Sequence, residues 1–432
     1  MQPLSRKHIA VRFADFFFII AMIIFILVVF RNYAISGEIV RDYLLPGDGM
    51  GHAYKVEMIK RMLFNERMLL DWDDGWYAGY HPFHFYSPLG YVPYVFLNMV
   101  LNDLGAAFRA GIVIGFIVSA IGMYFLVLTI LHDKASLLAV KLAATVAALF
   151  YSLNPRNTLF IAWGGELPAL YSIAIMPVSL LFLIRLLRSG SRKTAVGYAL
   201  VTATAFLTHA EFGLLAFAGG FLIFISETIR EVILSLEPGE SGLSMSYVMK
   251  KQILKTIACY FLSIILLGGL VAFWMIPFFA EANSLASVWA RPPASQYSIG
   301  YLDIVVRHVS IKYWRYIGAT AVIAMPLALI DREKWRDVGC FVFVFFVIWL
   351  LALGPNTPVY YLLPFEELFR PERSLSLLAL LVGCVLPYSL LAIRNRLDEG
   401  LRSRKLHRAI RHALPSAVTV VLILLVVFDI SI

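Results

Sequence analysis

The chain has 432 residues, of which 60% are hydrophobic and only 15% are charged, and its formal net charge is +9. An ordinary soluble domain is about half apolar and about a quarter charged. This composition excludes a soluble globular enzyme, a disordered protein and a nucleic-acid-binding protein. The apolar residues come in runs of roughly 16 to 25, the length that crosses about 30 Å of hydrocarbon. The sequence therefore predicts an all-α, polytopic transmembrane helix bundle.

The apolar runs predict about 11 crossings, which form a single transmembrane domain over residues 1–432 with no soluble C-terminal domain in the chain. They lie near residues 13–33, 107–131, 137–153, 168–187, 194–209, 212–229, 253–280, 314–330, 338–354, 374–393 and 413–432. No small-residue cleavage site follows the first run, which favours a retained signal anchor. Basic residues gather in alternate loops, as at Arg185–Lys193, a pattern typical of cytoplasmic loops. We expect a multi-pass plasma-membrane protein with a cytoplasmic N-terminus.

The segment 34–106 is then the first external loop. Its apolar stretch 91–104 is helical in pattern, but counting it as a crossing would place the basic loop 185–193 outside. We expect a juxtamembrane helix at the outer interface instead, where amphipathic and aromatic-rich segments are stable. Cys259, Cys340 and Cys384 each lie inside an apolar run, so we expect small core side chains rather than metal ligands.

Polar residues near the outer membrane surface are the candidate functional groups, because such groups are costly in a membrane unless they are paired or wetted. Asp48 and His52 are four residues apart after a Pro-Gly turn. If a helix begins near Asp48, its carboxylate caps that helix and His52 lies one turn on, on the same face. Asp48 is either a helix cap alone or a functional carboxylate, and its place at the exit of the first crossing favours function.

The stretch 71–88 mixes carboxylates, histidines and aromatic residues, including His81 and Tyr86. Aromatic faces with interleaved polar groups bind sugar rings, and they also form the aromatic belt at a membrane interface. Asp71, Asp73 and Asp74 offer the hard oxygen ligands that Mg²⁺ or Mn²⁺ takes, although any exposed acidic turn looks the same.

Two further candidates lie at predicted outer helix ends. Glu166 precedes the crossing at 168–187, where it either caps that helix or faces the same cavity as Asp48. His209, with Glu211, lies at a hairpin tip with almost no loop. This tip is either solvated or in contact with a headgroup.

Arg370 and Arg373 precede the crossing at 374–393 and are three residues apart, within one helical turn. Helix N-termini attract anions, and arginine forks match phosphate oxygens. Arginines on the outer side also run against the positive-inside trend. We favour phosphate binding over simple snorkelling of the side chains to the headgroups.

These motifs together resemble the GT-C superfamily of membrane glycosyltransferases, and within it the integral membrane proteins catalogued as related to 6-pyruvoyl-tetrahydropterin synthase. The resemblance spans about 48–385. It rests on Asp48 with His52, His81-Pro-Phe-His-Phe-Tyr-Ser-Pro-Leu89, Leu153-Asn-Pro155, Gly165-Glu-Leu-Pro168, Leu207-Thr-His209 and Phe369-Arg-Pro-Glu-Arg373. It implies a polyprenyl-phosphate sugar donor, an extracytoplasmic active site and an essential carboxylate in the first external loop, the position that Asp48 matches.

The resulting hypothesis is an inverting transfer of a sugar from a polyprenyl-phosphate donor to a lipid, glycan or protein acceptor. Asp48 serves as the catalytic carboxylate, with His52, His81, Tyr86, Glu166, His209, Arg370 and Arg373 as substrate contacts. A divalent cation, Mg²⁺ or Mn²⁺, is an open possibility, although position 49 is Gly and position 50 is Met, so that no second acid adjoins Asp48. The alternative is a polytopic transporter or flippase, which would place polar groups at the bilayer midplane on broken helices. Gly268, Gly269 and Pro277 leave that alternative open.

Overall fold

The computed structural model describes residues 6–31, 48–66, 72–75, 79, 81–131, 137–236, 243–286, 324–328, 335–362 and 370–403. Within these ranges every regular element is a helix. The main helices are α1 (Arg6–Val29), α4 (Gly49–Arg61), α5 (Pro82–Phe85), α6 (Val92–Leu101), α7 (Leu104–Ile130), α8 (Leu137–Ser152), α9 (Pro155–Gly164), α10 (Leu167–Ser189), α11 (Arg192–Thr208), α12 (Ala210–Leu236), α13 (Leu243–Ala286), α15 (Trp335–Ala352) and α16 (Ser374–Ser403). The predicted crossing 413–432 and most of 314–330 lie outside the described residues.

The long apolar helices confirm the all-α, multi-pass prediction. Six described helices are long and apolar enough to cross a membrane, and each coincides with a predicted crossing: Leu104–Ile130, Leu138–Thr158, Leu167–Ser189, Ala210–Leu236, Lys250–Ala280 and Pro371–Arg396. Shorter apolar helices lie at Phe13–Val29 and Val338–Ala352, also predicted crossings, and α11 occupies the one at 194–209. The total of 11 remains a prediction.

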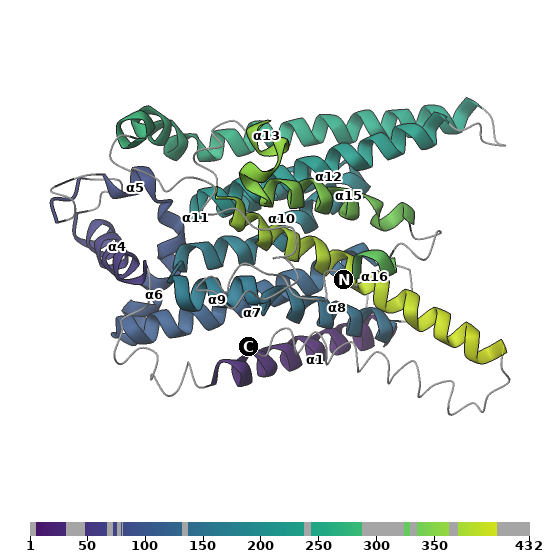
Figure 1. Ribbon diagram of the computed structural model, residues 1–432, viewed down its shortest axis with the longest axis horizontal. Coiled ribbons are helices and arrows are strands. Elements are labelled where there is room, and N and C mark those ends of the chain that lie inside the picture. Colours follow the sequence, from purple (N-terminus) through teal and green to yellow (C-terminus); the bar gives the residue numbers. More distant parts are fainter. Residues whose placement is uncertain are drawn as a thin grey trace.

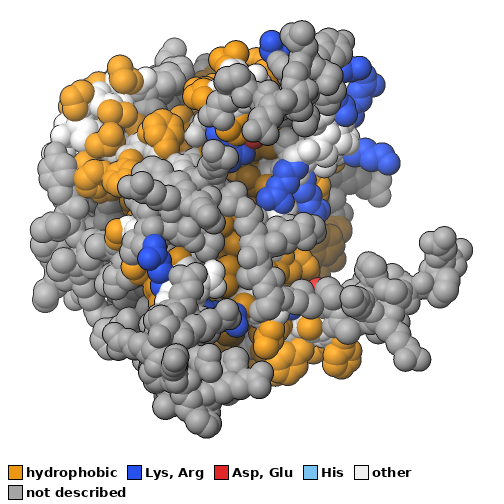
Figure 2. Space-filling model, turned by 90° about the vertical axis from the view of Figure 1, so that its right-hand side faces the viewer, with side chains coloured by type: hydrophobic (Ala, Val, Ile, Leu, Met, Phe, Trp, Pro, Cys, Tyr) orange, Lys and Arg blue, Asp and Glu red, His pale blue; other side chains and the backbone are white. Residues whose placement is uncertain are grey.

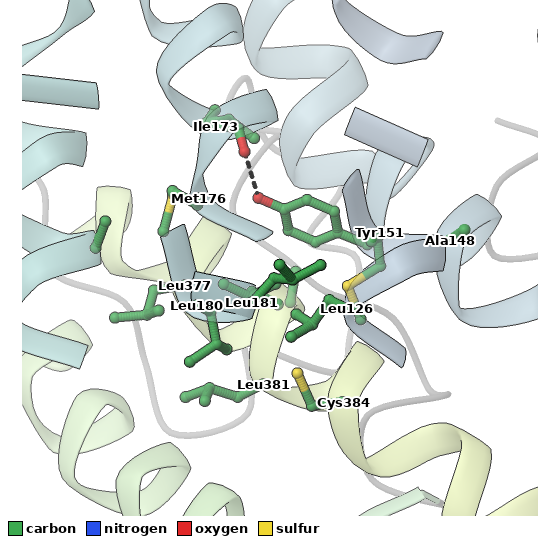
Figure 3. Close-up of a cluster of buried hydrophobic side chains, with 14 of the residues drawn as sticks. Leu126, Ala148, Tyr151, Ile173, Met176, Leu180, Leu181, Leu377, Leu381 and Cys384 are labelled. Carbon is green, nitrogen blue, oxygen red and sulfur yellow. Dashed lines mark hydrogen bonds between the residues drawn. The ribbon is translucent and has the colours of Figure 1, made fainter. Parts of the chain in front are cut away.

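Helix α16 forms the centre of the bundle. The buried share of its most apolar stretch is 94%, against 33% for α13, which lies along one side (Figure 1). Figure 3 shows Leu377, Leu381 and Cys384 of α16 in one buried cluster with Tyr151, whose hydroxyl donates to the carbonyl oxygen of Ile173 at 2.7 Å. All three cysteines are buried and free, as predicted. Close packing of this kind fixes the relative positions of the helix ends.

Helix α1 attaches to the bundle through a polar contact inside an apolar helix pair. Asp15 of α1 pairs with the buried Lys141 of α8 and accepts a hydrogen bond from Tyr124 of α7 at 2.9 Å. Ionisable groups at such depth are normally paired, because an isolated charge there is costly. Phe30 also stacks on Phe116 of α7, with ring centroids 4.8 Å apart.

The helices of the predicted first external loop dock on one end of the bundle. Figure 1 shows α4, α5 and α6 together at its left end. Trp274 Nε1 of α13 donates to the carbonyl oxygen of Phe83 at 2.8 Å, and Ser87 Oγ donates to that of Phe206 at 2.9 Å. At Gly90 a Cβ atom would lie 2.5 Å from the carbonyl oxygen of Thr208, so glycine permits the close approach. These contacts hold the loop helices against the ends of α11 and α13.

The expected juxtamembrane segment forms a helix of its own. Helix α6 ends at Leu101, and Asn102 has a φ of 49°, the left-handed conformation that terminates a helix. Asp103 then begins α7, its side chain accepting a hydrogen bond from the N–H of Ala106. The break separates α6 from the long membrane helix, as predicted. Its position at the membrane surface remains an expectation.

Candidate functional site

The predicted polar residues come together at the end of the bundle that carries α4, α5 and α6. Asp48 precedes α4, Glu166 precedes α10, His209 separates α11 from α12, and Arg370 and Arg373 precede α16. The tight helix ends position them: Gly165 has a φ of 68°, which closes α9 and directs Glu166 into the bundle. Four segments far apart in sequence thus supply one cluster.

Arg373 is the centre of this cluster. Its guanidinium pairs with Glu211 and donates to Oε1 of Glu166 at 3.1 Å, and it lies 3.5 Å from Nε2 of His209. Its side chain is only 8% exposed. A buried guanidinium between two carboxylates is a compensated charge, so Arg373 connects α10, α12 and α16 at this end.

Arg370 differs from Arg373 in its exposure. Its side chain is 38% exposed, and its guanidinium lies 3.9 Å from Oε1 of Glu166. Its main-chain N–H donates to Oε1 of Glu211 at 2.8 Å. The main chain of Arg370 is thus fixed by Glu211, while its charged group reaches solvent beside the buried cluster.

Asp48 is the N-cap residue of α4, as predicted, but its side chain makes no capping hydrogen bond. The prediction of side-chain capping is therefore wrong: the cap residue has φ −78° and ψ 1°, not the extended conformation typical of a side-chain cap. Asp48 keeps an exposed surface, but partial loss of hydration raises its pKa, and the Glu166 carboxylate raises it further. Arg370 and Arg373 act in the opposite direction. Asp48 therefore lies within electrostatic reach of the cluster.

His52 lies one turn after Asp48, and the main-chain N–H of His52 bonds the carbonyl oxygen of Asp48 at 3.1 Å, as the spacing predicted. Its Nδ1 is 2.9 Å from the hydroxyl of Tyr91. Its Nε2 is buried and has no hydrogen-bond partner among the described residues. Burial lowers the pKa of His52 to about 4, so the ring is neutral at pH 7.

Lys55 and Tyr86 form the side of the site next to α4. The ammonium group of Lys55 lies 4.1 Å from the centre of the Tyr86 ring, a cation–π contact. Burial lowers the pKa of Lys55 to about 8, although the nearby Asp48 carboxylate offsets part of this effect. Burial also raises the pKa of Tyr86 to about 12, with Glu166 and Asp48 adding to the effect. Tyr86 thus lies beside Lys55 and within electrostatic reach of Asp48 and Glu166, and its contact with substrate remains a prediction.

The carboxylate of Glu166 remains ionised despite its burial. Burial alone would raise its pKa, but Arg373 and His209 outweigh that effect and lower the pKa to about 2. Burial and Arg373 lower the pKa of His209 to about 3. Nδ1 of His209 is buried without a hydrogen-bond partner in the described part of the chain. The cluster therefore presents fixed charges and two neutral imidazoles at neutral pH.

His81 and the candidate metal ligands lie in a separate group. His81 stacks on His84, with ring centroids 4.5 Å apart, and meets the edge of Trp72. Asp73 is buried and accepts from the Tyr54 hydroxyl at 2.6 Å.

The other contacts of the acidic turn argue against a cation site there. Asp73 also pairs with Arg61 at 3.4 Å, so both of its carboxylate oxygens are engaged. Asp74 accepts from Trp72 Nε1 at 2.5 Å, and Asp71 lies outside the described residues. Across those residues, no three His, Cys, Asp or Glu side chains are arranged to hold a metal. Asp73 and Asp74 are therefore already engaged by protein groups, and the metal site remains a prediction.

Two members of the cluster were not among the predicted site residues. Glu211 binds both arginines, and Lys55 adjoins Asp48 and Tyr86. The sequence signal for Glu211 was its position two residues after His209 at the predicted hairpin tip. Lys55 is only 4% exposed, whereas a lysine is almost never fully buried unless it is paired, so its position could not be expected from the sequence.

Comparison with solved structures defines the class of fold. The chain is similar to the apo oligosaccharyltransferase of Archaeoglobus fulgidus, with a TM-score of 0.56 and 12% sequence identity over 96% of this chain and 56% of that one. It also matches the arabinofuranosyltransferase AftD from Mycobacteria, with a TM-score of 0.49 and 16% identity over 98% of this chain and 26% of that one. The chain has a GT-C-like helical membrane fold and spans about half the length of the oligosaccharyltransferase.

The family follows from the sequence itself. Residues 83–432 match the family of membrane proteins described as the 6-pyruvoyl-tetrahydropterin synthase related domain. The match covers most of the chain, and the chain belongs to this family, as its motifs predicted. No individual curated protein matches the sequence.

Proposed function

We propose that this chain is a membrane glycosyltransferase that moves a sugar from a polyprenyl-phosphate donor to an acceptor at the extracytoplasmic face of the plasma membrane. The observation that carries the proposal is the placement of Asp48. Its carboxylate makes no capping bond and lies within electrostatic reach of Arg370 and Arg373 at one end of the bundle. The fold supports this, since solved structures with the same architecture include an oligosaccharyltransferase.

The proposed reaction is a single displacement. The acceptor hydroxyl oxygen attacks the anomeric carbon as the bond from that carbon to the phosphate oxygen breaks, which inverts the configuration. The hydroxyl proton passes to Asp48, whose raised pKa makes it a stronger base than an ordinary aspartate. The departing polyprenyl phosphate carries away the bond electrons and gains charge.

The two arginines take different parts in this proposal. Arg370, the more exposed one, stabilises the charge that develops on the donor phosphate. Arg373 is already compensated by Glu166 and Glu211, so we assign it to positioning rather than to the donor. The buried ring nitrogens of His52 and His209 have hydrogen-bonding capacity for sugar or phosphate oxygens.

A transfer assay in proteoliposomes tests the proposal against the transporter alternative. Purified protein is reconstituted with polyprenyl-phosphate donors that carry a radiolabelled sugar, together with candidate lipid and glycan acceptors. Transfer of label to an acceptor, with release of polyprenyl phosphate, is the expected result. Movement of intact donor across the bilayer without transfer would contradict it. Helix α13 runs unbroken past Gly268, Gly269 and Pro277, which weakens the broken-helix argument for a transporter.

A further inference from the structure

A cavity of about 370 Å³ lies at the opposite end of the bundle from Asp48. The ends of α7, α10 and α12 line it together with parts of α13, α15 and α16. Figure 2 shows that lysine and arginine side chains gather on this end of the molecule. The volume falls within the range of small-ligand sites, and the proposed transfer reaction makes no use of it.

Arg188 supplies a cation to the lining of the cavity. Its guanidinium donates to the carbonyl oxygens of Thr129 and Ile130 at 2.5 and 3.2 Å, which closes the C-terminal end of α7. It pairs with no carboxylate among the described residues. A guanidinium carries five N–H donors, so donors remain after these two bonds are made.

Two neutral polar side chains stand beside Arg188. Gln252 and Thr256 of α13 line the cavity one turn apart. Both pack against the turn that follows α10: a Cβ atom at Gly190 would lie 3.0 Å from Gln252 Nε2 and 3.1 Å from Thr256 Oγ1. An amide, a hydroxyl and a guanidinium together form a donor set suited to phosphate oxygens.

The rest of the charged lining carries one net negative charge. Arg230 pairs with Glu227 at 2.7 Å and with Glu231 at 2.9 Å, so one guanidinium serves two carboxylates. Outside the cavity, α11 and α13 expose basic residues at the same end of the bundle: Arg192, Lys193, Lys250, Lys251 and Lys255. These cations outnumber the one net negative charge of the Arg230 group, so the field at this end favours an anion beside Arg188.

The neighbouring surface is apolar. Ile253 lines the cavity, and α13 next to it exposes Leu254, Phe261 and Ile265, which are 67%, 58% and 71% exposed. A ligand with an anionic head in the cavity would lay an apolar tail along this face. Basic pockets between membrane helices bind phospholipid headgroups in the same way.

We propose that this cavity binds a phospholipid of the adjacent leaflet, with its phosphate against Arg188, Gln252 and Thr256. Bound there, the lipid joins α10 to α13 at the basic end of the protein. The site is separate from the cluster around Arg373 and does not depend on transferase activity.

Native mass spectrometry of the full chain, released from detergent, measures this binding directly. Phosphatidylglycerol is added as the probe, with diacylglycerol as the lipid without phosphate and glycerol 3-phosphate as the phosphate without lipid. Phosphatidylglycerol is expected to remain bound where the other two do not. Equal retention of diacylglycerol would overturn phosphate recognition, and equal retention of glycerol 3-phosphate would overturn a lipid ligand.

The variants localise the binding. Arg188→Gln is expected to weaken phosphatidylglycerol binding at least tenfold, whereas Arg185→Gln, an exposed position one turn earlier that does not line the cavity, leaves it unchanged. The double variant Gln252→Ala with Thr256→Val spares the bonds to α7 and should also weaken binding, so the test holds if Arg188→Gln fails to fold. Unchanged binding in the double variant, or equal loss in Arg185→Gln, would contradict the assignment.

Discussion

The main-chain N–H of Arg370 donates to Oε1 of Glu211, and the other carboxylate oxygen of Glu211 binds the guanidinium of Arg373. One carboxylate at the start of α12 therefore holds both arginines that precede α16. It neutralises the buried guanidinium of Arg373 and fixes the main chain of Arg370, whose own guanidinium reaches solvent. We infer that Glu211 positions Arg370 for the donor without touching the donor itself.

Glu211→Ala should raise the KM for the donor more than it lowers kcat, because Arg370 loses its main-chain anchor. It should also lower stability by about 3 kcal/mol, the usual cost of removing one partner of a buried ion pair. Glu211→Gln keeps an acceptor for the Arg370 N–H and is expected to recover part of the donor affinity. Transfer kinetics and thermal unfolding check both variants, and a wild-type KM in Glu211→Ala would contradict the positioning role.

The two arginines should respond differently to substitution. Arg370→Ala removes a side chain that is 38% exposed and is expected to leave the unfolding temperature nearly unchanged while donor binding weakens. Arg373→Ala leaves Glu166 and Glu211 buried without their cation and should destabilise the protein by about 3 to 5 kcal/mol. Thermal unfolding beside donor binding separates these effects. Equal destabilisation by both substitutions would show that exposure does not divide their roles.

The stability of the protein should fall as the solution becomes acidic below about pH 6.5. His52 and His209 have folded-state pKa values of about 4 and about 3, below the ordinary value of 6.5. The unfolded chain binds more protons in this window, so stability is fully present above pH 6.5 and is lost as the pH falls toward 4. Thermal unfolding between pH 7.5 and pH 4 measures this.

A matched pair of variants tests the source of this pH dependence. His52→Gln should flatten the loss of unfolding temperature, since glutamine carries no proton in this window. His209→Gln should flatten the loss in the same way, since burial and Arg373 lower the pKa of His209 to about 3. An identical slope in wild type and His52→Gln would exclude His52 as a contributor.

Cysteine labelling in intact cells tests the predicted orientation. The native cysteines are buried, so their background reactivity should be low. Met50→Cys, at a position 57% exposed beside Asp48, should react with a membrane-impermeant maleimide added outside. Lys193→Cys, at the basic end, should react only after permeabilisation. The reverse pattern would place the cluster in the cytoplasm.

The sequence was sufficient to predict the class of fold and the segments that meet at the site. Apolar length predicted the membrane helices, since the requirement to span hydrocarbon acts on each helix separately. The early placement of Asp48 and the late placement of Arg370 and Arg373 predicted their convergence, because outer helix ends in a bundle must lie near one another. The family resemblance supplied the expectation of chemistry.

The pairing within the site could not be predicted, because it depends on packing between helices. Nothing in the pattern distinguishes Arg370 from Arg373, although burial makes one a structural cation and the other an exposed one. The hydrogen bond that Asp73 accepts from Tyr54, 19 residues away, has no signal in the sequence either. The missing side-chain cap at Asp48 depends on the φ and ψ angles of that residue, which the sequence Pro-Gly-Asp does not determine.

The central claim is that Asp48 takes the acceptor proton during sugar transfer. The most direct measurement is the single-turnover transfer rate of Asp48→Asn, with donor binding and unfolding temperature measured on the same sample. We predict a rate lower by about 100-fold or more, the usual contribution of a general base, with donor binding and unfolding temperature close to wild type. A wild-type transfer rate in Asp48→Asn would contradict the account.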